Sequence, residues 1–145
     1  MATTTPNFGW TVPTSSDLVK NGATAIETLG DSVDASFAGL TVNAQTGTSY
    51  TAVKADGLNA IVTMDNASAN TFSIPTDATY AFPTGTTLLV YQKGAGVTTI
   101  QAALSGTTTV VSAGAVAAAP VLARYKSAAC IKIAANSWIV VGAVA

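Results

Sequence analysis

The stretch "TTLLVYQKGAGVTTIQAA", residues 86–103, decides the fold class of this chain. Short runs of branched and aromatic residues lie on both sides of a glycine pair, and such runs bounded by turn residues are typical of strands. Gly94 and Gly96 between the two runs predict a hairpin turn. The segment lacks the third glycine of a dinucleotide fingerprint and the Gly-Lys-Ser/Thr of a phosphate loop, so a nucleotide-binding interpretation is not supported.

The same strand-like sequence pattern extends from about Gly47 to the end of the chain. Short runs rich in Val, Ile, Thr and aromatics are separated by Gly, Pro, Asn and Asp, and a second hairpin is predicted through Ala135 and Asn136 in "IKIAANSWIV". Eight or nine such strands leave no room for crossover helices. We therefore predict a β-rich head domain over residues 41–145, built as an antiparallel β-sandwich or jelly-roll-like domain.

Residues 14–40 carry a different pattern, which predicts an amphipathic helix. Thr14 or Ser15 is the expected N-cap, with Asp17 in the first turn. Apolar residues recur at heptad spacing, and the charged residues fall on the outer positions. The predicted seam consists of Val19, Ile26, Leu29, Val33 and Leu40. Gly22 and Gly30 weaken the helix, so it should pack against copies of itself, the protein's own body or a partner's surface.

The segment "NFGWTVP", residues 7–13, precedes this helix and is flanked by Pro6 and Pro13, which disfavour helix. It carries two large aromatic residues on what reads as an irregular arm. Residues 1–40 are therefore predicted to form an attachment arm and helix, with partner-binding residues Phe8, Trp10 and Val12. The alternative is that Phe8 and Trp10 fold back onto the protein's own head.

Composition narrows the possible partners. The 145 residues are 49% apolar and only 9% charged, which argues against a disordered chain. A formal net charge of −1 gives no reason to expect nucleic acid as a partner. No apolar run approaches the roughly 20 residues of a membrane-spanning helix, so we expect no membrane insertion. The N-terminus has no secretory pattern, which favours synthesis in a cytoplasm.

The residue types available for chemistry are few. There is no histidine, and Asp56, Asp65 and Asp77 occupy turn-like contexts, so we expect no enzyme, no cofactor and no metal. A calcium site beside Asp65 that includes Asn66 and Asn70 is a weaker alternative. The single cysteine, Cys130, is predicted to be a buried, inert thiol. The basic residues near the C-terminus, Arg124, Lys126 and Lys132, are interpreted as a solvated sheet face, with contact to an acidic partner as the alternative.

With these residues in view, the sequence resembles surface proteins of tailed-bacteriophage virions. The opening "TTTPNFGWTVPTSSDLVKNGATAIETLGDSVDAS" resembles N-terminal segments of minor tail and fibre-like proteins. The body is similar to β-rich modules of fibre and decoration proteins in "SYTAVKADGLNAIVTMDNASANTFSIP", "AFPTGTTLLVYQKGAGVTTI" and "CIKIAANSWIVVG". Together these stretches cover most of the chain, and none of them is a catalytic motif.

The resemblance implies a structural virion component that is homotrimeric. The first expectation is a capsid decoration or head-fibre protein, anchored by its N-terminal segment with the β domain displayed outward; its partners are then itself and the major capsid protein. The alternative is a minor tail or tail-fibre protein, bound to a tail protein, whose β domain binds a host-surface glycan or receptor. For that alternative Tyr50, Tyr80, Tyr91 and Trp138 are candidate stacking residues, although Trp138 in "SWIVV" is more typical of a core or subunit interface.

Overall fold

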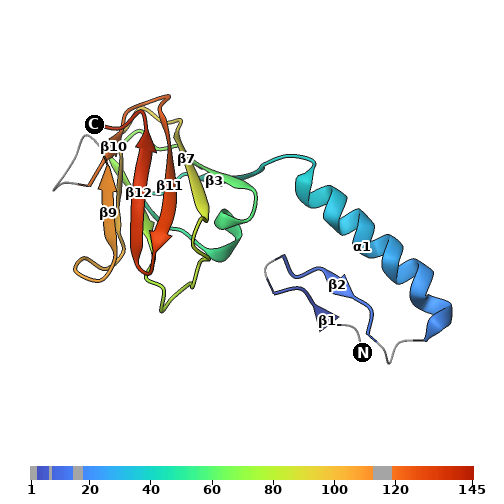
Figure 1. Cartoon of the computed structure of the whole chain (residues 1–145). Coiled ribbons are helices and arrows are strands. Elements are labelled where there is room, and N and C mark those ends of the chain that lie inside the picture. The colour runs from blue at the N-terminus through green and yellow to red at the C-terminus, as the bar shows by residue number, and fades with distance from the viewer. Residues whose placement is uncertain (1–2, 7, 15–17, 113–118) are drawn as a thin grey trace. The chain divides into compact units, whose positions relative to one another are not determined.

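The computed structural model describes residues 3–6, 8–14, 18–112 and 119–145 of the chain (Figure 1). The chain forms two compact units, Met1–Leu40 and Thr41–Ala145. The first unit holds a small hairpin and the helix, and the second, which we call the head, holds two β-sheets. The prediction of a mainly β chain with one helix is confirmed.

The N-terminal arm is a hairpin and not an irregular segment. Strands β1 (Thr3–Thr4) and β2 (Thr11–Val12) pair antiparallel, with Thr3 opposite Val12. The turn closes because the Gly9 amide donates to the Thr5 carbonyl at 3.0 Å while Gly9 adopts a positive φ of 70°, which costs glycine nothing. As expected, the described residues between Pro6 and Pro13 contain no helix, and Thr11 and Val12 among them form β2.

The helix begins later than predicted. A 3₁₀ turn, η1 (Val19–Asn21), leads into α1 (Gly22–Phe37), and Leu18 before it keeps an extended backbone. Thr14 is therefore not the N-cap, while Ser15 and Asp17 lie outside the described residues. Asn21 occupies the N-cap of α1 without a side-chain capping bond, and Gly39 follows the end of the helix. The seam residue Leu40 consequently lies beyond the helix, and Val19 lies in the 3₁₀ turn.

The head contains one sheet of six strands and one of four. The six-stranded sheet has the order β3-β5-β7-β11-β12-β9, with bounds Thr41–Gln45, Ala60–Met64, Thr87–Gln92, Ser127–Ala134, Ser137–Gly142 and Thr109–Ser112. The four-stranded sheet has the order β10-β8-β6-β4, with bounds Val121–Leu122, Thr98–Ala102, Asn70–Ile74 and Ser49–Thr51. A 3₁₀ turn, η2 (Lys54–Gly57), links β4 to β5.

The expected antiparallel arrangement is wrong for most of these pairings. From β3 to β8 the chain alternates between the two sheets, so β3, β5 and β7 pair in parallel, as do β4, β6 and β8. Antiparallel pairs occur at β7·β11, β11·β12 and β8·β10. Parallel strands need a long crossover connection. Here a strand of the opposite sheet, and not a helix, serves as that crossover.

The two predicted hairpins have different outcomes. The hairpin through Ala135 and Asn136 is confirmed, since β11 and β12 pair antiparallel and Asn136 takes a positive φ of 49°. The hairpin through Gly94 and Gly96 is wrong, because β7 and β8 belong to different sheets. That turn instead carries the chain from one sheet to the other. Its glycines are required by a close approach, because a Cβ on Gly96 would lie 2.0 Å from the Ser68 carbonyl oxygen.

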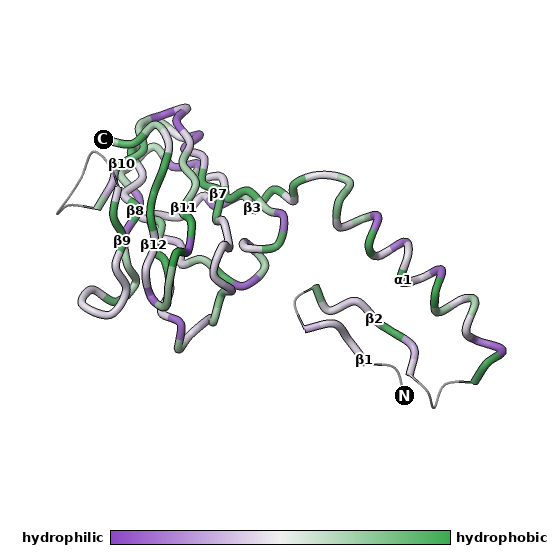
Figure 2. Tube along the Cα trace, viewed as in Figure 1, coloured by the Kyte–Doolittle hydropathy of each residue, from purple (hydrophilic) through white to green (hydrophobic). Residues whose placement is uncertain are grey.

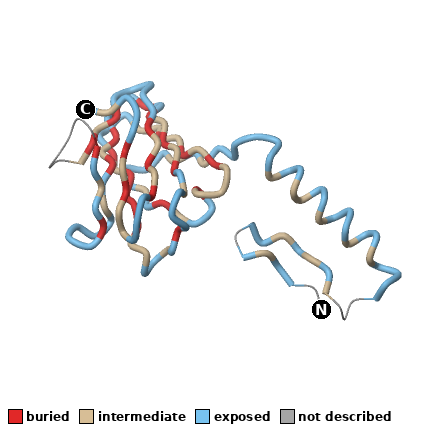
Figure 3. The backbone as a smooth tube through the Cα atoms, in the orientation of Figure 1, coloured by how far each residue is buried: buried red, intermediate tan, exposed pale blue. Residues whose placement is uncertain are grey.

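Both sheets contribute to one hydrophobic core (Figure 3). Trp138 on β12 is fully buried and meets Phe82 edge to face, with ring centroids 5.6 Å apart. Phe72 and Ile74 come from the four-stranded sheet and are also fully buried. The position of Trp138 confirms the core alternative for this residue and removes it from the candidate stacking surfaces.

Candidate attachment site

The aromatic residues of the N-terminal unit gather in one cluster. Phe8 and Trp10 stack with centroids 4.8 Å apart and planes at 20°, and Phe8 also approaches Phe37 of α1 at 6.5 Å. The Trp10 indole Nε1 donates to Ser36 Oγ at 3.1 Å, which fixes the hairpin to the helix. Phe8 remains 38% exposed and Phe37 71% exposed. The cluster thus has one supported side and one open side.

This geometry changes the interpretation of the arm. Phe8 and Trp10 rest on the helix of their own unit, so they are not a freely displayed pair. Val12, the third predicted partner-binding residue, lies on β2 opposite Thr3 and is half-buried. The sequence analysis did not select Phe37. This residue lies outside the predicted seam, and nothing in its neighbourhood in the sequence indicated that it would contact Phe8.

The predicted helical seam is divided into two faces. Leu29 and Val33 of the seam are half-buried, and Gly22 and Ser36, which lie seven residues to either side of Leu29, are half-buried as well. Val19 and Ile26 of the same seam are 95% and 65% exposed. Figure 2 shows green and purple alternating along α1, as expected for an amphipathic helix. No residue of α1 is fully buried, so its apolar side is only partly covered within the unit.

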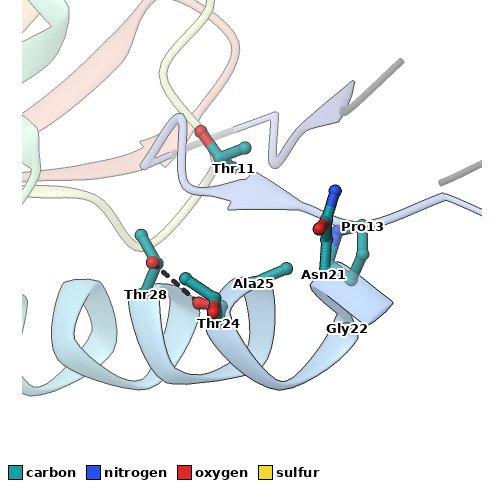
Figure 4. Close-up of a pocket in the computed structure, with 7 residues that line it drawn as sticks. All are labelled: Thr11, Pro13, Asn21, Gly22, Thr24, Ala25 and Thr28. Carbon is teal, nitrogen blue, oxygen red and sulfur yellow. Dashed lines mark hydrogen bonds between the residues drawn. The ribbon is translucent and has the colours of Figure 1, made fainter. Parts of the chain in front are cut away.

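A cavity of about 350 Å³ lies between β2 and the start of α1 (Figure 4). Its lining is neutral and comes from the hairpin and the first helical turns: Thr11, Pro13, Asn21, Gly22, Thr24, Ala25 and Thr28. The Thr28 hydroxyl already donates to the Thr24 carbonyl at 2.8 Å. The described lining residues carry hydroxyl, amide and small apolar groups and none of them is titratable, so this part of the cavity suits an uncharged side chain.

The head holds a buried carboxylate near its first strand. Asp56 on η2 is 2% exposed, and it accepts hydrogen bonds from Tyr50 Oη and Asn43 Nδ2, both at 2.7 Å, and from the Val53 amide at 2.8 Å. Burial, and then the bond to Asp56, raise the pKa of Tyr50 to about 12. Every partner of Asp56 is a donor within the fold, so this cluster holds a turn against β3 and β4.

The basic residues near the C-terminus are not one solvated face. Arg124 and Lys126 are exposed, but Lys132 is 4% exposed, and its Nζ lies 2.6 Å from Asp77 Oδ1 and 2.6 Å from the Phe82 carbonyl oxygen. Asp77 Oδ2 also accepts from the Asn136 amide at 3.1 Å. Alternation along β11 directs Lys132 inward, and the buried ammonium is stabilised by this charge pair.

The calcium alternative finds no support in the geometry. Asp65 pairs with Lys93 at 2.7 Å, Asn66 bonds backbone groups of Thr46 and Ser68, and Asn70 is buried against Thr98. Within the described residues no group of three His, Cys, Asp or Glu side chains could hold a metal ion. Cys130 is buried, as predicted, and burial raises the pKa of its thiol to about 12, which keeps it protonated and unreactive.

In the part of the chain that the structure describes, none of the helices is long and apolar enough to cross a membrane. No protein-family model matches this sequence, and neither curated proteins nor solved structures give a match. Function must therefore be argued from the chain's own residues and from the resemblance described above.

Proposed function

We propose that the chain is a structural protein of a tailed-phage virion, a capsid decoration or head-fibre protein. It forms a homotrimer with sandwich-type heads, is bound to the major capsid protein through its N-terminal unit and displays the head outward. The observation that carries the proposal is the cluster of Phe8, Trp10 and Phe37, an exposed aromatic surface on a unit whose helix buries no residue. Aromatic anchors of this kind dominate many protein interfaces.

The division of the chain supports the same proposal. The head carries its own core, whereas the N-terminal unit presents apolar residues that a partner can cover. On a repetitive shell many modest contacts act together, so a small anchor suffices for stable attachment. We assign no catalytic role to the acids, because the buried Asp56 and the paired Asp77 both have structural partners in the fold.

Two measurements test the proposal. Electron microscopy of purified virions labelled with an antibody against residues 41–145 should show label spread over the shell. Label confined to the tail would favour the tail-fibre alternative, and absence of label on any particle would refute a virion role. In a binding assay with virions that lack the protein, Trp10→Ala together with Phe8→Ala should abolish attachment. Tyr125→Ala, which alters an exposed ring of the head, is the matched control.

A second candidate function is recognition of a host-surface glycan by the head. Tyr125 favours it, because this ring is 62% exposed and has the Arg124 guanidinium 4.5 Å from its centre. Exposed aromatic rings beside hydrogen-bond donors suit the apolar faces of sugars. Tyr50 and Tyr80 pack against the core and are less suitable. Binding of the full chain to a glycan array, lost in Tyr125→Ala, would establish this function, and uniform absence of binding would remove it.

A further inference from the structure

The outer face of the six-stranded sheet carries a band of hydrocarbon side chains bordered by hydroxyl-bearing residues. The border consists of the outward row Thr63, Tyr91 and Ser127 and the outward pair Thr109 and Ser137. Alternation along the strands sends one set of residues into the core and the other set outward. The pairing register aligns the outward residues into a row across five strands, which consists of Val42, Ile61, Leu89, Ala129 and Val141. A second row joins Thr87, Ile131, Ile139 and Val111. The only charged residue of these six strands, all of them described, is Lys132, and it points inward.

The four-stranded sheet gives the internal comparison. Its outward residues also align in rows, and these are Ser49, Thr71, Thr99 and Val121 in one and Thr51, Ser73 and Gln101 in the other. This face is made chiefly of hydroxyl and amide groups, which water solvates well. The two outer faces of the head therefore differ in polarity, although both are built from strands. The hydroxyl face is suited to water, and the hydrocarbon face is suited to burial.

The hydrocarbon face is open in the single chain. Val42 is 63% exposed, Val141 46% and Ile133 48%, while Ile61 and Leu89 are half-buried by their neighbours in the sheet. A shallow cavity of about 370 Å³ runs over it beside Leu89, Ala129 and Val141. Monomeric proteins rarely leave an apolar surface of this extent in water, which indicates that something covers it.

The width of the hydrocarbon face indicates which kind of partner can cover it. Six strands spaced at roughly 4.8 Å make a face about 25 Å wide. A single helix with its side chains is about 10 to 12 Å across, so α1 of the same chain would cover less than half of that width. The equivalent sheets of neighbouring copies are together wide enough to cover all of it. Because no charged side chain points outward from these strands, a copy of the face meets no like-charge repulsion.

We propose that the outer face of the six-stranded sheet is the surface through which the head packs against a second copy of itself. In the homotrimer of the proposed function, three such faces turn toward a common axis, and the hydroxyl faces of the four-stranded sheets turn toward solvent. The number of copies rests on the proposed function, whereas the choice of face rests on the strand register. The subunit contact that holds the oligomer together thereby lies in the head.

The first test changes the charge of each face in the full chain. Leu89→Glu with Ile139→Glu alters the hydrocarbon face, and Thr71→Glu with Thr99→Glu is the matched control on the hydroxyl face. Light scattering after size exclusion should give an oligomeric mass for the wild type and the control, and the 14.4 kDa monomer for the hydrocarbon-face variant. Circular dichroism must show that the variant remains folded. An unchanged oligomeric mass in a folded Leu89→Glu, Ile139→Glu variant, or a monomeric wild type, overturns the proposal.

A second test keeps the proposal falsifiable if the charged variant fails to fold. Ala129→Cys places a thiol on the hydrocarbon face and Thr99→Cys places one on the hydroxyl face, while native Cys130 is buried and contributes little background. At high protein concentration the Ala129→Cys thiol should react at least about tenfold more slowly than Thr99→Cys, and dilution to the monomer should remove this protection.

The other occupants of the face give different outcomes of the thiol test. Protection that persists in the monomer means that the chain's own N-terminal unit covers the face, and this overturns the proposal. Reaction at the same rate as Thr99→Cys at every concentration means that nothing in the purified protein covers it, and this also overturns the proposal. All these measurements use purified protein without virions, so their failure is distinct from a failure of virion labelling.

Discussion

In the head, large side chains such as Phe72 and Trp138 are fully enclosed, whereas in the N-terminal unit no residue of α1 is buried and Ile26 and Phe37 stand largely in water. Both units contain aromatic residues and similar proportions of small ones, so composition alone does not explain the difference. The head closes two sheets over its apolar residues, and the N-terminal unit has only one short hairpin to place against one helix. The head therefore encloses its large apolar residues, whereas the N-terminal unit leaves apolar residues exposed, and these form the surface that a partner would cover in the proposed function.

The largest expected effect is the loss of Trp138. Trp138→Ala removes a fully buried side chain that meets Phe82, and it should lower the free energy of unfolding of the head by about 3 to 5 kcal/mol. Trp10→Ala is the matched change in the N-terminal unit, and it should leave unfolding of the head nearly unchanged. Urea denaturation followed by circular dichroism measures both. A similar loss in the two variants would contradict the view that the head is stabilised independently.

A second contrast uses the close approach of the turn between β7 and β8. Gly96→Ala places a methyl group where the Ser68 backbone already lies, so we expect a loss of about 1 to 3 kcal/mol in the stability of the head. The turn must move as a whole, because the obstructing atoms are backbone and not a flexible side chain. The midpoint of thermal unfolding should fall accordingly. An unchanged midpoint would mean that this turn is not closely packed on Asn66–Ala69.

Alkaline pH should weaken the head through Tyr50. Its pKa is about 12 in the folded chain and about 10 when unfolded, so the stabilisation is present below pH 10 and is lost as pH rises from 10 toward 12. Burial of the neutral phenol and its bond to Asp56 are the causes. Tyr50→Phe should therefore show a shallower decline in unfolding midpoint above pH 10 than the wild type. Tyr125→Phe, on an exposed ring, is the control and should retain the wild-type decline.

The smallest effect is expected in α1. Gly30→Ala adds a methyl group with no atom within 4 Å, and alanine favours a helix over glycine by up to about 1 kcal/mol. Helix content by circular dichroism should rise slightly, with no change in the unfolding midpoint of the head. Gly22→Ala is a useful comparison, since that position lies in the wall of the cavity beside Thr11. A decrease in helix content in Gly30→Ala would show that this side of the helix is already packed.

The sequence predicted where strands occur better than how they pair. Runs of branched and aromatic residues marked β5 and β7 almost to the residue, because such runs bounded by turn residues are typical of strands. The strand that pairs with β7 could not be predicted from the sequence. A glycine-rich turn between two strands has the same sequence pattern whether the strands share a sheet or lie in opposite sheets. Strand β3 was missed because its inward residues Asn43 and Gln45 are polar. Asn43 donates to Tyr50 and Asp56, and Gln45 donates to Asn43, and these partners become visible only when the chain folds.

The candidate site was also predicted in part. The aromatic residues Phe8 and Trp10 are prominent in the sequence, so their selection needed no structure. The contact of these two residues with α1 was not predictable. The hydrogen bond from Trp10 to Ser36 joins residues 26 positions apart, and it forms only because the hairpin packs against the helix. Lys132 was misinterpreted for a similar reason. Its partner Asp77 is 55 residues away, and only the position of β11 in the sheet turns the side chain inward.

The alternation of the chain between the two sheets from β3 to β8 also constrains how the head can vary in length. Each pair of strands, one in each sheet, forms a coil that rests mainly on the coils before and after it, as in repeat proteins. Removal or addition of one complete coil would keep every remaining strand in its register and on its correct face. Removal of a single strand would move all later strands into the wrong sheet. We therefore expect this region to tolerate insertions and deletions in units of two strands.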